Sequence, residues 1–203
     1  MKSFALPTST LIATVSLLSL VTIGTVRNIM IPGSQLRTET LIAQANYKEA
    51  IAHFNRGINY TQQEKLALAI AEYTRAIELD PNYALAYNNR ADIYYQQQKH
   101  DLALADWNRA IEIDPLLAVA YINRGSLYYL QKKSDLALAD FNTTIDLDPR
   151  FAEAYFIRGA IYYSRKETEK AIADLTTAAE LFRQQGNTEM YNSAIEALRQ
   201  IGA

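Results

Sequence analysis

Three prolines lie at equal intervals in the chain, and this spacing constrains its fold more than any other feature. Pro81, Pro115 and Pro149 follow one another at a distance of 34 residues. Each proline ends a similar phrase, Ala-Ile-Glu-Leu-Asp-Pro, Ala-Ile-Glu-Ile-Asp-Pro or Thr-Ile-Asp-Leu-Asp-Pro. A fixed period of this length is typical of one supersecondary unit repeated in tandem. We therefore expect a stack of similar units, and such an architecture argues against an enzyme.

The residues between the prolines repeat as well and divide the chain into four units. Within each unit, apolar residues recur at spacings of three and four, which places them on one face of a helix. Two such segments per unit predict a pair of amphipathic helices, and small residues in both are expected to face each other so that the helices approach closely. The units are 50–83, 84–117, 118–151 and 152–185, and the facing small residues are Gly57, Ala91, Gly125 and Gly159 with Ala69, Ala103, Ala137 and Ala171.

Polar residues mark the expected helix ends. Asp101, Ser134 and Thr168 stand where their side chains could accept hydrogen bonds from the free backbone amides at the start of a helix. Each Asp-Pro pair is interpreted as the start of the next unit, with aspartate as the N-cap and proline in the first helical turn. These residues predict where the helices begin.

The pattern resembles that of the tetratricopeptide repeat (TPR) family over about residues 50 to 185. The resemblance rests on the period, on the spacing of aromatic and small residues in the first helix, on the alanine and large residue of the second, and on the proline. The end units depart from it, because His53 replaces an aromatic residue and Arg183 replaces the proline. The resemblance implies an all-α fold, an α-solenoid of four TPR helix pairs in a right-handed superhelix with an inner groove.

Residues 186–203 are expected to form a C-terminal capping helix. An array of repeats needs such a helix to cover the apolar end of its last unit. Its apolar residues would fall on one face, and they are Tyr191, Ala194, Ile195, Leu198 and Ile201.

The first residues are not part of the repeat. No charged residue occurs from Phe4 to Val26, a length that suffices for a membrane-spanning helix and also fits a secretory signal. Residues 1–26 are therefore expected to be a signal peptide or a membrane anchor, and both alternatives remain open. Residues 27–49, which include Pro32, are interpreted as a linker. On this basis we expect the repeats to be exported across a membrane or anchored in one, in a bacterial-type envelope or periplasm.

Composition limits the chemistry that the chain can perform. Its 203 residues include no cysteine, which excludes disulfides, thiolate zinc sites and a cysteine nucleophile. The formal net charge of −2 gives no basic footprint for nucleic acid. The two histidines, His53 and His100, lie at a core position and at a helix end, where we expect structural roles. Because no metal-ligand spacing or phosphate loop is present, no catalytic residue, metal or cofactor is expected.

One charged pairing recurs in every unit. An arginine of the first helix is followed 16 residues later by an acid of the second helix, and antiparallel helices could bring the two together. We expect these pairs to fix how the helices of each unit pack. They are Arg56 with Glu72, Arg90 with Asp106, Arg124 with Asp140, and Arg158 with Asp174.

A second face of each first helix remains after the core residues are assigned. By resemblance to the family, this face is the inner surface that holds an extended peptide or a partner helix. Asparagines offer donors and acceptors to a peptide backbone, and tyrosines offer contact area with few rotamers to freeze. The alternative is that these side chains only pack against the neighbouring unit. The candidate groove residues are Asn55, Asn88, Asn89, Asp92, Tyr95, Ile122, Asn123, Ser126, Tyr129, Phe156 and Tyr163.

One specialised role of the family is not expected. Members that clamp the acidic C-terminal tail of a chaperone use two lysines, an arginine and two asparagines. Of the matching positions in the first three units only Asn89 fits, and in the last three only Asn123 fits. Asp92 and Glu153 occupy two of the other positions and would repel a carboxylate.

The sequence thus predicts a non-catalytic protein–protein interaction scaffold that binds a peptide or a partner protein in its groove, exported or membrane-anchored. An alternative is an assembly factor for an envelope or membrane protein complex, which requires that the anchor is retained. An enzyme with a site between the repeats is a third interpretation, but Asp92 and Glu153 are the only carboxylates at the groove positions.

Overall fold

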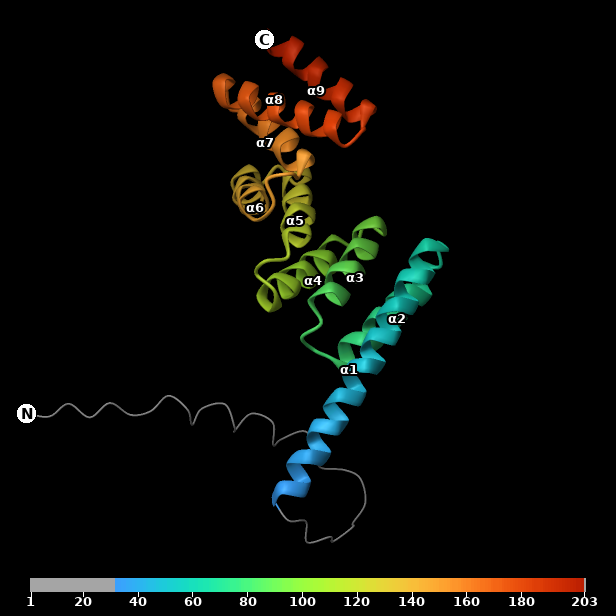
Figure 1. Cartoon of the computed structure of the whole chain (residues 1–203). Coiled ribbons are helices and arrows are strands. Elements are labelled where there is room, and N and C mark those ends of the chain that lie inside the picture. The colour runs from blue at the N-terminus through green and yellow to red at the C-terminus, as the bar shows by residue number, and fades with distance from the viewer. Residues whose placement is uncertain (1–31, 203) are drawn as a thin grey trace, which may run out of the picture. The chain divides into compact units, whose positions relative to one another are not determined.

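The computed structural model describes residues 32–202, and every regular element in that range is an α-helix (Figure 1). The all-α architecture predicted from the repeat period is confirmed for this part of the chain. The signal peptide or membrane anchor expected at residues 1–26 lies outside the described residues. The helices are α1 (Pro32–Gln62), α2 (Leu66–Leu79), α3 (Ala84–Gln96), α4 (His100–Ile113), α5 (Ala118–Leu130), α6 (Ser134–Leu147), α7 (Ala152–Ser164), α8 (Thr168–Gln184) and α9 (Thr188–Ile201).

The structure differs from the expected linker at 27–49, because the chain is helical from Pro32 onward. A proline suits the first turn of a helix, where its missing amide hydrogen would have no partner, so the residue that suggested a linker begins α1 instead. The contacts between residues divide the chain after Leu41, and Ile42–Ala203 form one compact unit. Of the helices described in residues 32–202, none combines the length and apolar character that crossing a membrane requires.

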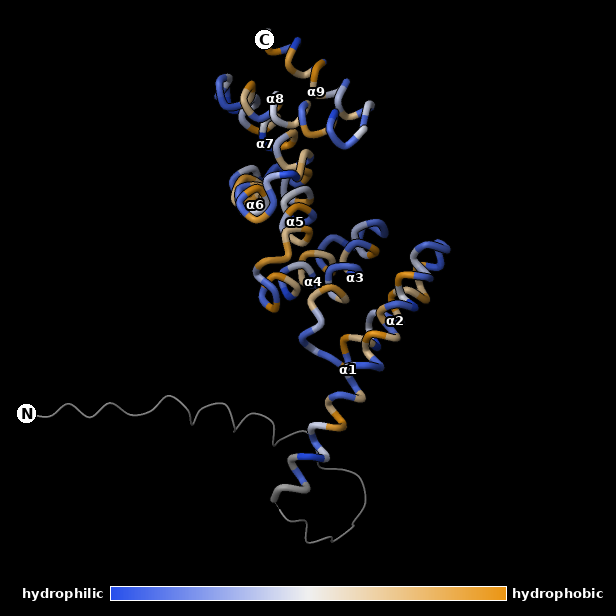
Figure 2. The backbone as a smooth tube through the Cα atoms, viewed as in Figure 1, coloured by the Kyte–Doolittle hydropathy of each residue, from blue (hydrophilic) through white to orange (hydrophobic). Residues whose placement is uncertain are grey.

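The helices of the compact unit form consecutive pairs. α3 packs on α4, α5 on α6 and α7 on α8, and each pair also contacts the next one along the chain. α1 meets α2 through close contacts such as that of Gly57 with Tyr73. α9 packs on α8, in the place expected of a capping helix. Figure 2 shows that hydrophobic and hydrophilic residues alternate along each helix, as they do when one side is buried.

Each pair closes around one large residue of its second helix. Tyr73, Trp107, Phe141 and Leu175 are at most 1 % exposed. A Cβ atom on Gly57 would lie only 2.5 Å from Tyr73 Cε1, and one on Gly125 would lie 3.2 Å from Phe141 Cε1. These glycines leave room for the large side chains, which would lie nearer to the added Cβ atoms than the alanines four residues earlier do, because in a close-packed interior the largest side chain needs the gap.

The Asp-Pro pairs end helices instead of beginning them. Asp80, Asp114 and Asp148 are the C-cap residues of α2, α4 and α6. Their Oδ1 atoms accept hydrogen bonds from the backbone amides two residues further on, at 3.0, 3.0 and 3.1 Å. An aspartate that bonds its own backbone in this way favours a turn, and the proline that follows cannot continue the helix.

The expected N-caps of the second helices were also wrong. The N-cap positions of α4, α6 and α8 are held by Lys99, Lys133 and Glu167, none of which makes a side-chain capping bond. Before each of these residues, and before Lys65, the N-cap residue of α2, the chain takes a left-handed conformation at a residue other than glycine. These residues are Glu64, Gln98, Lys132 and Lys166, with φ between 57° and 62°. The amide that follows each one bonds back across the turn, as in Lys133 N to Tyr128 O at 2.9 Å, which satisfies a free helix carbonyl.

The arginine–acid pairs predicted from the sequence are confirmed. Arg124 donates two hydrogen bonds to Asp140, from Nε at 2.9 Å and from Nη2 at 2.7 Å. Its third nitrogen, Nη1, donates to Asn108 Oδ1 on α4 of the preceding pair at 2.7 Å. Arg90 and Arg158 repeat this arrangement. Each arginine therefore joins the two helices of its own unit and also fastens that unit to the one before it.

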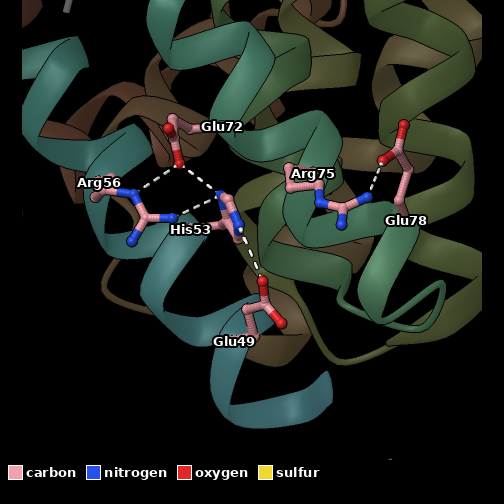
Figure 3. A network of polar contacts seen from close by, with 6 residues as sticks. All are labelled: Glu49, His53, Arg56, Glu72, Arg75 and Glu78. Atoms are coloured by element: carbon pink, nitrogen blue, oxygen red, sulfur yellow. Dashed lines mark hydrogen bonds and ion pairs between the residues drawn. The ribbon is translucent and has the colours of Figure 1, made fainter. Parts of the chain in front are cut away.

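The first unit closes with a different cluster (Figure 3). Arg56 Nε donates to Glu72 Oε2 at 3.0 Å, and His53 Nδ1 lies 2.7 Å from the same oxygen. His53 Nε2 also approaches Glu49 Oε1, at 3.8 Å. Burial raises the pKa of Glu72, but the hydrogen bonds to His53 and Arg56 outweigh it and hold that pKa below its ordinary value. His53 therefore belongs to the ion-pair cluster that joins α1 to α2.

Candidate functional site

A groove of about 560 Å³ lies across the first helices of three successive pairs, and we call it the central groove. Its lining combines polar groups with apolar ones, and most of it comes from α3, α5 and α7. One side chain, Phe151, comes from the turn before α7. The lining residues are Leu85, Asn88, Asn89, Asp92, Val119, Ile122, Asn123, Ser126, Phe151, Glu153 and Ile157.

Asp92 lies where the central groove meets two smaller hollows, which are lined by Ile58 and Tyr73 on one side and by Tyr95 and Trp107 on the other. Its Oδ1 accepts hydrogen bonds from Trp107 Nε1 at 3.0 Å and from Asn123 Nδ2 at 2.9 Å. Burial raises the pKa of Asp92 to about 6 from an ordinary 3.8, although both hydrogen bonds act in the opposite direction. Asp92 thus links α3, α4 and α5, and its carboxylate ionises only at a higher pH than an ordinary aspartate.

Asn88 is a second polar residue of the groove that is unusual, because it is almost completely buried. It is only 4 % exposed. Its Nδ2 donates to Asn89 Oδ1 at 3.2 Å and reaches Asp92 Oδ2 at a long 3.4 Å. Its Oδ1 is buried and has no hydrogen-bond partner. A buried acceptor without a partner is unfavourable by about 1–3 kcal/mol.

The structure places six of the candidate groove residues in the central groove and a seventh, Tyr95, in the adjoining hollow. The remaining four do not line it. Tyr129 and Tyr163 are exposed, at 39 % and 48 %, and Asn55 is exposed on α1. Phe156 packs edge-to-face on Phe182, with ring centroids 6.3 Å apart, and so belongs to the core. The six residues that do line the groove are Asn88, Asn89, Asp92, Ile122, Asn123 and Ser126.

Sequence reasoning missed several residues of this surface. Leu85 was not considered, although it precedes Val119 and Glu153 by one and two repeat periods and all three line the groove. That shared repeat position is the signal that could have found it. Phe151 lies outside the helices, where helical spacing gives no information. Trp107 belongs to the core of the second unit, yet its indole nitrogen also donates to Asp92.

The charges of the groove are of one sign. Asp92 and Glu153 are its charged lining residues, and among the described residues that line it there is no lysine or arginine. Elsewhere in residues 32–202, no group of three or more histidines and carboxylates is placed to hold a metal ion. The groove therefore offers hydrogen bonds and negative charge between apolar walls.

The fold and the groove define a helical repeat protein with a recessed surface shared by neighbouring units. Comparison with known families supports this description. A family profile described as TPR repeat matches residues 57–98, and profiles described as tetratricopeptide repeat match residues 84–115, 118–151 and 152–185. Together these matches span more than half of the chain. The chain belongs to the tetratricopeptide repeat family.

Solved structures show the same fold. A crystal structure of MamA aligns with a TM-score of 0.62 at 22 % identity and covers 79 % of this chain and 99 % of that one. The second TPR domain of human RPAP3, solved by NMR in complex with the HSP70 peptide SGPTIEEVD, has a TM-score of 0.53 at 32 % identity, covering 57 % of this chain and 97 % of that one.

The first TPR domain of Spaghetti (RPAP3), bound to the HSP90 peptide SRMEEVD, has a TM-score of 0.56 at 27 % identity and covers 59 % of this chain and 95 % of that one. No curated protein sequence gives a significant match. The all-α TPR solenoid predicted from the sequence is thus confirmed.

Proposed function

We propose that this chain is a non-catalytic interaction scaffold and that its central groove binds an extended peptide segment of a partner protein. The observation that carries the proposal is the set of amides that line the groove, those of Asn88, Asn89 and Asn123, together with apolar residues such as Val119 and Ile157. Amides can bond both the donors and the acceptors of a peptide backbone. Similar TPR domains have been solved with peptides bound, which supports the same use here.

The peptide is not expected to be an acidic chaperone tail. The peptides bound by the RPAP3 domains end in EEVD. In this chain the groove carries Asp92 and Glu153 and no lining lysine or arginine, so a terminal carboxylate would meet repulsion. The proposed partner therefore differs in charge from those of the RPAP3 domains.

A groove-blocking variant tests the proposal. Short linear peptides from a random library are selected on the full chain and their affinities are then measured by calorimetry. Val119→Arg places a long side chain in the groove, whereas Leu136→Arg makes the same kind of change at an exposed position on α6 outside it. We expect peptides to lose about tenfold or more in affinity for Val119→Arg, because each 1.4 kcal/mol of lost contact is tenfold.

Leu136→Arg should bind like the original chain, and the circular dichroism of both variants should stay helical. If no peptide is selected, or if the selected peptides bind Val119→Arg undiminished, the groove is not the binding site.

The location of the repeats is a second part of the proposal. The uncharged run from Phe4 to Val26 supports export of the repeats or their anchoring in a membrane, with a periplasmic or envelope location. N-terminal sequencing of the mature protein tests cleavage, and extraction with carbonate tests anchoring. A protein that keeps its N-terminus and yet is recovered free of membranes would contradict both alternatives. A retained anchor would favour a role in assembling a membrane protein complex.

A further inference from the structure

The hydrogen-bonding groups of the central groove are out of balance. Asn88 Oδ1 is a buried acceptor without a partner. Asp92 Oδ2 is reached only by Asn88 Nδ2, at 3.4 Å, whereas Oδ1 of the same carboxylate has two short bonds. Glu153 adds a second carboxylate at the exposed edge. On the side of the groove formed by α3, Asn88 Oδ1 and Asp92 Oδ2 thus lack a good donor, and Glu153 adds a further acceptor on α7.

The charge of Asp92 is also uncompensated. Its two short bonds come from an indole and an amide, which are neutral donors. The other titratable groups in the hollows that it lines are Tyr73 on α2, Tyr95 on α3 and Glu153 on α7, and none of them is a cation. This contrasts with Asp140, which has a guanidinium bonded to both of its oxygens. A buried carboxylate without an opposite charge is costly, and a bound cation would relieve that cost.

The apolar residues of the central groove suit a chain of methylene groups. Val119, Ile122 and Ile157 line the same groove. Lysine and arginine side chains characteristically lay an aliphatic stem along apolar surface while the charged end reaches a polar group. The combination of apolar walls with acceptors at one end therefore matches the shape and chemistry of a basic side chain.

We propose that the central groove takes up a lysine or arginine side chain of the bound peptide, with its charged end at Asp92 Oδ2. The stem lies along Val119, Ile122 and Ile157, and Glu153 attracts basic residues near the groove edge. The inference rests on the proposed function, since it specifies the chemistry of the same peptide. Because the pKa of Asp92 is about 6, the carboxylate is mostly ionised at neutral pH, when it attracts a cation.

The test uses peptides selected from the random library on the full chain at pH 7.5. In a selected peptide with one lysine, that lysine is replaced by N-acetyl-lysine, which keeps the stem and removes the charge. We expect this change to weaken binding about tenfold to a hundredfold, the size of a charged hydrogen bond. On Asp92→Asn the same change should weaken binding less than about threefold, because the ionic partner is already gone.

Asp146→Asn supplies the matched control, because it removes one negative charge at an exposed position on α6 outside the groove. This variant should behave like the original chain toward both peptides. Selected peptides without lysine or arginine, or an equal effect of acetylation on the original chain and on Asp92→Asn, would overturn the inference. If such peptides still lose affinity for Val119→Arg, the scaffold function stands and only the cationic anchor fails. If these peptides bind Val119→Arg as tightly as they bind the original chain, the groove is refuted as the binding site.

Discussion

Asp92→Asn is expected to stabilise the folded chain at neutral pH. Asparagine keeps an oxygen that can accept from Trp107 and Asn123, and it removes a carboxylate whose pKa burial raises to about 6. An acid with a higher pKa in the folded chain than in the unfolded chain binds its proton more tightly when folded. The unfolding free energy therefore falls as the pH rises between the two values.

The magnitude follows from the two pKa values of Asp92. The rise from 3.8 to about 6 spans about two pH units, and at about 1.4 kcal/mol for each unit the ionised form destabilises the fold by at most about 3 kcal/mol. Asp92→Asn should thus gain about 1–3 kcal/mol at pH 7.5 and little at pH 4, with most of the change between pH 4 and pH 6. Loss of the carboxylate's stronger hydrogen bonds sets the lower end of that range.

The assay is urea unfolding followed by circular dichroism at several pH values, with the variant compared with the original chain at each pH. Asp146→Asn again serves as the control, since an exposed carboxylate should show little difference at any pH. The reasoning is refuted if Asp92→Asn is less stable at pH 7.5, or if its gain is the same at pH 4 and pH 7.5. A confirmed gain would mean that Asp92 lowers the stability of the free chain, as residues of a binding site often do.

Two further changes test the scaffold around the groove. Arg124→Ala leaves Asp140 buried without its partner and should lower the unfolding free energy by about 3 kcal/mol, or the melting temperature by about 6–12 °C. Arg109→Ala removes an exposed arginine and should barely change the melting curve, so equal shifts would contradict the role given to Arg124. Lys132→Gly should raise the unfolding free energy by about 1 kcal/mol, because glycine adopts a φ of 60° without strain. Lys133→Gly, next to it at φ −87°, should lower the unfolding free energy, and chemical denaturation that moves both variants in the same direction would exclude strain at Lys132.

The repeat period predicted the parts of the fold that recur. The helix pairs and the arginine–acid bonds follow from spacings that sequence shows directly, and both were confirmed. The helix ends did not follow, because aspartate has similar preferences at the start of a helix and in the turn after one. Whether Asp114 begins or ends a helix depends on whether the residues after it are buried in the core. Leu116, which lies in the turn after Asp114, is 74 % exposed and so is not part of the core.

The groove was predictable only in part, for a geometric reason. Spacings of three and four residues identify which side of a helix faces inward, but they do not say how far along the helix the recess extends. Asn123 and Ser126 line the groove, whereas Tyr129, one turn later on the same side of α5, is exposed beyond it. The position of neighbouring helices decides where the recess ends, and helical spacing within one segment does not contain that information.

The second unit departs from the repeat at one of the two positions where the groove carries a charge. At the position of Asp92 the other units have Ile58, Ser126 and Ala160, and at the position of Asn88 they have large apolar residues. The second unit also has the only tryptophan, Trp107, whose Nε1 donates to Asp92. A tyrosine, phenylalanine or leucine at the equivalent positions of the other units has no ring N–H to donate. The acid and its donor therefore occur in the same unit as a matched pair, which packing of identical repeats does not require. We infer that the repeated positions build the scaffold and that this unrepeated pair gives the groove its specificity.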